Sequence, residues 1–267
     1  MSGLRFFLIS SALLFCLGLL NSSVADQSLD PIESAIVDWS ETHTGEAIEL
    51  LETLVNINSG SLNQQGVREV GAVLRAELDT LGFDTRWIDF PPEMKRGGHL
   101  FGERAGKRGN KILLIGHLDT VFEPDDAFQT FSRDGSIATG PGVEDMKSGD
   151  VIIIYALKAL QQAGVLDGSQ IMVAFTGDEE STGKPLSLSR QELIEAGKWA
   201  DVALGFEAGI DSDGKEWVTI SRRSSSNWCL EVTGKQAHSA GIFNDRTGAG
   251  AIFEAARILH EFYTQVR

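Results

Sequence analysis

The sequence predicts an α/β fold in which helices pack on a mostly parallel β-sheet. Residues 45–57 and 66–83 repeat apolar side chains at helical spacing, whereas residues 111–119 and 169–180 are apolar runs of strand length. Helical and strand patterns alternate along the chain, and this alternation is typical of a sheet whose strands are connected by helices. In open sheets of this kind ligands bind at the carboxyl ends of the strands.

Each expected element has its own signal. The helix over 66–83 presents one apolar face and meets Gly82, a residue suited to a helix C-terminus, and the helix over 150–164 is stopped by Gly164. Apolar or β-branched runs predict the strands. In chain order the expected elements are helices 45–57 and 66–83, strands 85–90 and 111–119, helix 150–164, and strands 169–180 and 201–209.

Composition describes an ordinary globular chain with an acidic surface. The 267 residues are 42% hydrophobic and 23% charged, and 38 acidic residues against 23 basic ones give a net charge of -15. Such a surface repels nucleic acid and anionic membranes, so we expect neither as a partner. Acidity alone identifies no function, but it permits a cluster of carboxylates.

Residues 1–25 form a secretory signal peptide by their pattern. One arginine precedes an apolar run over 6–20, and small residues follow up to Ala25, after which cleavage is expected. A membrane anchor is the alternative, but the run is short for a spanning helix. We therefore expect a secreted or periplasmic protein with no stable membrane anchor. Cys16 would leave with the signal, so Cys229 would have no partner for an internal disulfide.

Polar side chains gather where the apolar strands end. One imidazole and several carboxylates are placed there, and a glycine-rich loop over 138–150 adds two more carboxylates before a helix. Singly, each residue could be a strand cap, a helix cap or a solvated loop residue. Together they predict one polar rim, formed by His117, Asp119, Glu144, Asp145, Asp178, Glu179, Glu180 and Glu207.

Crowded carboxylates repel one another and need a cation to hold them together. A mixture of histidine and carboxylates suits zinc, with manganese or cobalt as substitutes, whereas calcium prefers oxygen ligands alone. An acidic calcium-binding module is therefore the less favoured alternative. His117 and Asp119 are two residues apart on an extended segment, so their side chains leave the same face. Asp119 can then accept the N–H of an imidazole whose other nitrogen binds metal, which makes the pair a ligand and its orienter.

Five ordered motifs resemble a known family. They are "GHLDTV", "GPGVEDMKSG", "TGDEEST", "GFEAG" and "VTGKQAHSAG", and they cover the chain from about residue 40 to its end. In order and spacing they resemble the co-catalytic zinc peptidases that include glutamate carboxypeptidase, aminoacylase and succinyl-diaminopimelate desuccinylase. The resemblance implies two zinc ions per complete site and a cis peptide bond after Asp145.

The resemblance also implies a role for each matching residue. His117 and Glu207 would bind the first zinc, Asp145 would bridge both ions, and Glu180 would bind the second. Glu179 would be the general base and Asp119 the orienter. An adjacent pair can divide these roles, because ligation fixes Glu180 as an anion and leaves Glu179 free to move a proton.

The composition changes after about residue 217. Two strand-like runs surround a Ser/Asn-rich turn over 217–234, and an amphipathic helix follows over 249–262. By the resemblance this is the start of an inserted α+β lid and dimerisation domain, in which His238 reaches the substrate of a neighbouring subunit. The expected domains are 1–25 as the signal, 26–217 as the N-terminal part of the catalytic domain, and 218–267 as the beginning of the lid.

These motifs and the resemblance predict that the protein is a metal-dependent hydrolase. It would cleave an amide bond of a small peptide or N-acyl amino acid, as a carboxypeptidase-like exopeptidase, through water held by two zinc ions, and a full-length form would be a homodimer. Relatives carry a late histidine on the second zinc, and no later motif supplies it here. The alternative is a truncated, catalytically incompetent remnant that binds at most one metal tightly.

Overall fold

The computed structural model describes residues 29–221 and 227–266. The expected signal peptide, 1–25, lies outside the described residues. Two compact units divide the chain between Gly209 and Ile210. Each is described by itself below. In the described part of the chain, no helix combines the length and the apolar character needed to cross a membrane.

The first unit is built on a five-stranded sheet, as the sequence predicted. Its spatial order is β1 (Asp84–Ile88), β2 (His99–Arg104), β6 (Ser169–Thr176), β3 (Arg108–His117) and β7 (Val202–Gly205). β3 runs parallel to both β6 and β7, whereas β2 is antiparallel to β1 and β6. The three parallel strands therefore end at the same edge of the sheet.

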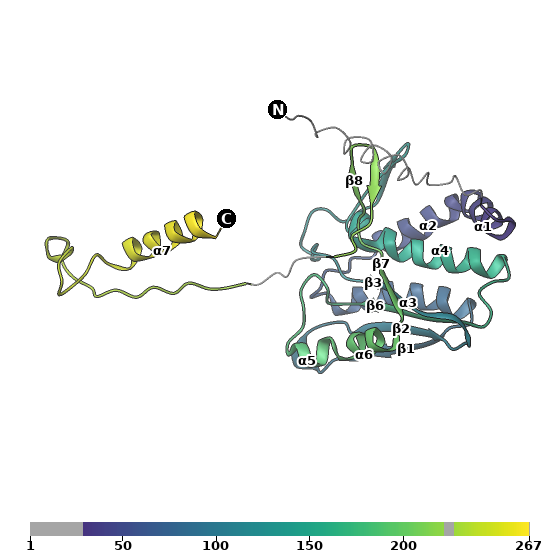
Figure 1. Ribbon diagram of the computed structural model, residues 1–267, viewed down its shortest axis with the longest axis horizontal. Helices are drawn as coiled ribbons and strands as arrows, with labels where there is room; N and C mark the ends of the chain where they lie inside the picture. The colour runs from purple at the N-terminus through teal and green to yellow at the C-terminus, as the bar shows by residue number, and fades with distance from the viewer. Residues whose placement is uncertain (1–28, 222–226, 267) are drawn as a thin grey trace, which may run out of the picture. The chain divides into compact units, whose positions relative to one another are not determined.

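Helices cover both faces of this sheet (Figure 1). On one face lie α2 (Thr44–Val55), α3 (Gln64–Thr80) and α4 (Ser148–Gln162), which share one apolar core with the sheet. Representative buried members of that core are Leu54, Leu74, Ile154, Val173 and Phe175. A smaller core on the other face joins the sheet to α6 (Gln191–Trp199), which follows the short α5 (Leu186–Ser189). The mostly parallel sheet between helices confirms the predicted fold class.

Local signals explain the helix boundaries. α1 (Pro31–Thr42) begins with a capping box in which Asp30 and Glu33 bond each other's backbone N–H. After α3 the chain turns at Gly82 with φ 75°, and after α4 it turns at Gly164 with φ 70°. Glycine adopts this left-handed conformation without steric cost, so both helices end where the sequence indicated.

Strand β2 is the main element that the sequence pattern did not predict. It inserts between β1 and β6, and its buried residues, beginning with His99 and Leu100, face both cores. Its sequence "HLFGER" contains a glycine and no regular alternation. The strand exists because two neighbours satisfy its backbone on both sides, which a pattern of single residues does not reveal.

The remaining elements of the first unit are short. They are η1 (Pro92–Met94), the hairpin of β4 (Ser132–Asp134) and β5 (Ile137–Thr139), and η2 (Val143–Lys147), which leads directly into α4. Lys147, the last residue of η2, stabilises this turn. Its buried ammonium donates to the carbonyls of Leu54, 2.9 Å away, and Ile57, 3.0 Å away. These bonds fix the loop that carries Asp145 to the end of α2.

The second unit contains the hairpin of β8 (Ile210–Ser212) and β9 (Lys215–Trp217), the single turn η3 (Ser239–Gly241) and α7 (Ala251–Gln265). The amphipathic helix expected over 249–262 is present as α7. Of the strand runs expected over 217–234, only Trp217 lies in a strand, as the last residue of β9. The other described parts, 218–221 and 227–234, pair with no other described segment. An extended segment needs a neighbour to satisfy its backbone hydrogen bonds, and no segment among the described residues supplies one.

Candidate metal centre

The polar rim predicted from the sequence lies at the shared edge of the parallel strands. His117 ends β3 opposite Thr176, the last residue of β6, and the acidic segment 178–180 follows at once. β7 ends at Gly205, two residues before Glu207. Parallel pairing thus brings segments that are distant in sequence to one place.

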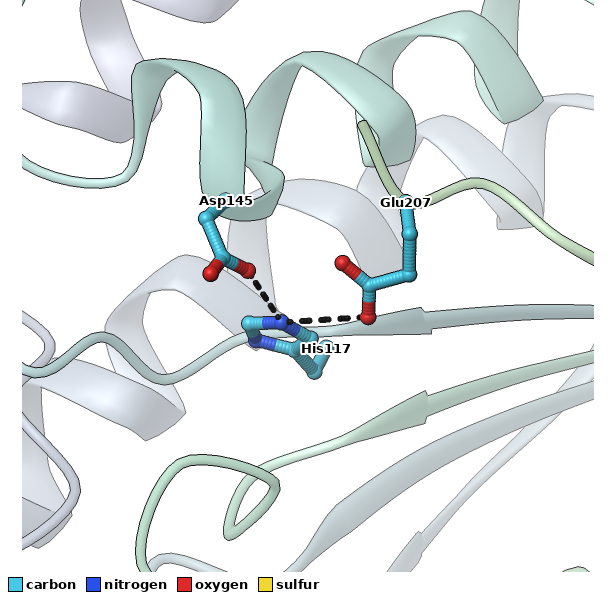
Figure 2. A group of neighbouring side chains, drawn as sticks. All are labelled: His117, Asp145 and Glu207. Atoms are coloured by element: carbon cyan, nitrogen blue, oxygen red, sulfur yellow. Dashed lines mark hydrogen bonds and ion pairs between the residues drawn. The ribbon is translucent and has the colours of Figure 1, made fainter. Parts of the chain in front are cut away.

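His117, Asp145 and Glu207 point toward one another (Figure 2). The His117 Nε2 atom lies 3.0 Å from Asp145 Oδ1 and 3.6 Å from Glu207 Oε1. One ligand atom from each residue lies within 4.8 Å of the other two. His117 is buried at the base of the group, whereas Asp145 and Glu207 are partly exposed above it. Three residues from three segments therefore form an open group of potential metal ligands.

The other nitrogen of His117 is held by the backbone, not by the carboxylate that we expected. Nδ1 lies 2.9 Å from the main-chain oxygen of Asp119 and 3.7 Å from its Oδ1 atom. A carbonyl oxygen only accepts, so Nδ1 must carry the proton. A neutral ring would then present its Nε2 lone pair to two carboxylates, so a proton or a metal cation on Nε2 stabilises the arrangement.

The Asp119 carboxylate holds the acidic loop instead. It is fully buried and accepts from Ser61 Oγ at 2.6 Å, from the Glu179 N–H at 2.9 Å and from the Glu180 N–H at 3.1 Å. Asp119 therefore orients His117 through its carbonyl and the two glutamates through its side chain. Ser61 is a member of this arrangement that the sequence did not reveal, because it lies 58 residues away from Asp119.

The electrostatics of the group favour a bound cation. Burial by itself lowers the pKa of His117, but the carboxylates of Asp119 and Glu207 outweigh it and the pKa is raised. Burial, followed by the neighbouring Asp145 carboxylate, raises the pKa of Glu180 to about 7. The crowding of negative groups in a poorly solvated place contributes to both shifts. A divalent cation relieves this repulsion, and the imidazole-plus-carboxylate donor set fits zinc, cobalt or manganese.

Asp145 and Glu207 are positioned by the elements around them. The Asp145–Met146 peptide bond is cis, as the family resemblance predicted. Glu207 follows Phe206, whose carbonyl lies so close to Gly149 that a Cβ on that glycine would be 2.1 Å from the oxygen. α4 thus packs directly against the backbone that carries Glu207, and only glycine allows the approach.

Two small hollows adjoin the group. One, of about 220 Å³, is lined by His117, Glu179 and Glu207 together with apolar side chains that include Met146 and Leu193. The other, of about 290 Å³, is lined by Asp145 and Glu180 together with Val121 and Phe122. Glu179 and Glu180, adjacent in sequence, therefore face different hollows beside the same group.

The remaining rim residues take other positions. Asp178 is fully buried and turns away into contacts with Arg190 and Ser189, and Glu144 lines the larger hollow. His238 belongs to the second unit, where it is exposed and its Nδ1 accepts from the Ala240 N–H at 3.2 Å. Its predicted contact with substrate stays a prediction.

Comparisons with known proteins agree with the motifs. The sequence profile described as peptidase family M20/M25/M40 matches residues 113–258. Carboxypeptidase G2 from Pseudomonas sp. (strain RS-16) is 34% identical over 213 residues, which cover 79% of this chain and 49% of that protein. Succinyl-diaminopimelate desuccinylase from Gluconobacter oxydans (strain 621H) is 30% identical over 176 residues, which cover 63% of this chain and 45% of that protein. The chain spans about half the length of the curated relatives it matches.

Solved structures share the fold. Human carnosine dipeptidase 1 superposes with a TM-score of 0.54 at 19% identity, over 64% of this chain and 40% of that one. The di-peptidase Dug1p from Saccharomyces cerevisiae superposes with a TM-score of 0.53 at 20% identity, over the same shares of the two chains. With the matched profile spanning more than half of the sequence and reaching from β3 into α7, the chain belongs to peptidase family M20/M25/M40.

Proposed function

We propose that the chain carries the metal-binding and proton-transfer residues of a hydrolase that cleaves an amide bond in a small peptide or an N-acyl amino acid. The observation that carries the proposal is the convergence of His117, Asp145 and Glu207 beside two further glutamates. Membership of a peptidase family and similarity to a carboxypeptidase and a desuccinylase support the choice of bond.

His117, Asp145 and Glu207 would hold a first divalent cation, and Glu180 with the bridging Asp145 would contribute to a second. We propose zinc for both. When bound, such cations polarise the scissile carbonyl and acidify water between them. Their positive charge would also offset the repulsion from Asp145 that, after burial, raises the pKa of Glu180.

Glu179 is the proposed general base. Its N–H is held by Asp119, and its side chain lines the same hollow as His117 and Glu207, so it is fixed in place without being needed as a ligand. A Glu179 carboxylate oxygen takes a proton from the attacking water as the new C–O bond forms. It then gives that proton to the amide nitrogen as the C–N bond breaks, which yields a carboxylic acid and an amine.

Three further features of the proposal rest on sequence patterns. The motif "VTGKQAHSAG" supports a substrate contact by His238 in a dimeric, full-length form, with 218–267 as the start of the domain that carries it. The pattern of residues 1–25 supports export from the cytoplasm. Similarity to a carboxypeptidase supports exopeptidase action on substrates with a free carboxylate.

The variant Glu179→Gln tests the proposal, because the amide keeps the shape of the side chain and removes its basicity. We expect zinc content to be unchanged and turnover of free dipeptides or N-acyl amino acids to fall by about 10²–10⁴-fold, the usual contribution of a general base. Glu195→Gln, the same change at an exposed position on α6, is the control and should behave as wild type. Near-normal turnover in Glu179→Gln, or no hydrolysis by the wild-type protein, would contradict the proposal.

A further inference from the structure

Behind the two glutamates lies a buried polar network with no contact to the metal ligands among its hydrogen bonds. Its centre is Asp178, which is fully buried. Asp178 Oδ2 accepts from the Gly183 N–H at 2.8 Å and from Ser189 Oγ at 2.6 Å, and Oδ1 accepts from Arg190 Nη1. This carboxylate therefore ties together both ends of the segment 178–190.

The guanidinium of Arg190 donates hydrogen bonds to residues of the same segment. Nη1 donates to Ser189 Oγ at 2.6 Å as well as to Asp178, and Nη2 donates to the Asp178 carbonyl at 3.1 Å and to Thr182 Oγ1 at 3.2 Å. These contacts account for all four terminal N–H groups of the side chain. Arg190 also lines the hollow that contains His117 and Glu179, but its terminal donors are already engaged and are not available to a substrate anion.

His99, the first residue of β2, is the last member of the network. Its ring is fully buried, and burial lowers its pKa, which keeps it neutral. Nδ1 accepts from the Gly177 N–H at 3.0 Å and Nε2 donates to the Ser189 carbonyl at 2.9 Å, a pairing that defines a single tautomer. His99 thus joins the end of β6 to the end of α5.

Glu179 and Glu180 lie between these anchors. Asp119 holds their N–H groups on the side of the metal ligands, and the network holds Asp178 and the segment's far end on the other. A buried network in which the charges are paired is rigid, whereas losing one member leaves buried polar groups unsatisfied. The backbone of the two glutamates is therefore fixed from both sides.

We propose that Arg190 is a positioning residue, which acts through Asp178 to set the Glu179 and Glu180 side chains relative to His117. Only the kinetic part of its test rests on the proposed function. Since a misplacement of about 1 Å in a catalytic group can cost about 10²-fold in rate, Arg190 should affect turnover without touching substrate.

The test compares Arg190→Ala with Arg86→Ala in the full chain. Arg86 is a suitable control because it likewise pairs with a carboxylate, that of Glu192 at the start of α6, and forms no hydrogen bond or ion pair with the segment 177–190 among the described residues. Amide hydrogen exchange is measured over residues 177–183 and, as an internal reference, over β3. Zinc content and, on a dipeptide, kcat and KM are measured separately.

We expect Arg190→Ala to speed exchange over 177–183 by about tenfold or more while β3 is unchanged, since the effect is local. kcat should fall by about 10²-fold with KM within about threefold, because the residue acts on catalytic geometry and not on substrate affinity. Arg190→Lys, which keeps the charge but not the fork of donors, should lie between alanine and wild type, and it serves as the test variant if the alanine form does not fold.

Unchanged exchange over 177–183 would overturn the proposal whatever the kinetics show. Equal acceleration in β3 would also overturn it, by revealing a general loss of stability. A raised KM with normal kcat would show that Arg190 contacts substrate instead. If the wild-type protein hydrolyses nothing, the proposed function fails on its own, and the local exchange result still decides the role of Arg190.

Discussion

Replacing Asp119 with asparagine should destabilise the first unit far more than an exposed Asp→Asn change does. The carboxylate is fully buried and accepts three hydrogen bonds, two at Oδ2 from Ser61 and Glu180 and one at Oδ1 from Glu179. Asparagine retains one oxygen, which is best placed at the Oδ2 position because that position accepts two hydrogen bonds. Its NH₂ group then faces the Glu179 N–H, and two donors oppose each other.

The magnitude follows from these contacts. A hydrogen bond to a charged group contributes about 1.5–3 kcal/mol, and an unsatisfied buried donor costs about 1–3 kcal/mol more. Part of this loss is offset, because removing the charge relieves the repulsion that Asp119 exerts on Glu180 and Asp150. We expect a net loss of about 2–4 kcal/mol in the free energy of unfolding of the metal-free protein.

Urea denaturation measures this loss as a lower midpoint at unchanged slope. Asp126→Asn is the matched control, since its carboxylate accepts only from the Phe128 N–H, among the hydrogen bonds found for the described residues, in an exposed turn. It should change stability by about 0.5 kcal/mol or less. A loss under about 1 kcal/mol for Asp119→Asn would refute the inference that this carboxylate holds the glutamate loop.

Two further predictions concern the supports of the site. Burial lowers the pKa of His99 in the folded protein. Below pH about 6.5 the unfolded chain therefore binds a proton at His99 that the folded protein does not. The free energy of unfolding then falls as pH falls, by at most about 1.4 kcal/mol per pH unit. His99→Gln should remove this part of the pH dependence in urea titrations, and an unchanged dependence would exclude a buried neutral ring. Gly149→Ala should push Phe206 and Glu207 away from α4 and weaken zinc binding, measured calorimetrically, by about tenfold or more, as losses of supporting contacts do. Gly197→Ala, in a helix with open space around the position, is its control; equal zinc affinities would show that the contact does not place Glu207.

The strand-end arrangement of the site could be predicted because it depends on strong local signals. Apolar runs identified β3, β6 and β7, and polar residues directly after such runs must meet when the strands are parallel. Hence the sequence predicts that His117 and Glu207 lie together, and the glycine-rich loop before α4 adds Asp145 to the group. The cis bond after Asp145 came from the family resemblance alone.

Other features depend on contacts that no local pattern encodes. The two-residue spacing suggested that the Asp119 side chain would accept from His117, but the backbone turns after β3 and presents the carbonyl instead. The support from Ser61 and Arg190 arises from tertiary packing across many residues. Strand β2 likewise owes its existence to neighbours on both sides, which outweigh its weak intrinsic pattern.

Divalent metal binding by the full chain tests the central claim most directly. Titration calorimetry with zinc should show a site whose affinity falls by about 100-fold or more in His117→Ala and Asp145→Asn, since losing a ligand costs more than losing a supporting contact. His260→Ala, which removes an exposed histidine on α7, should leave the affinity unchanged. Zinc binding that is equally tight in all three variants, or absent from the wild-type protein, would contradict the assignment of this group as a metal centre.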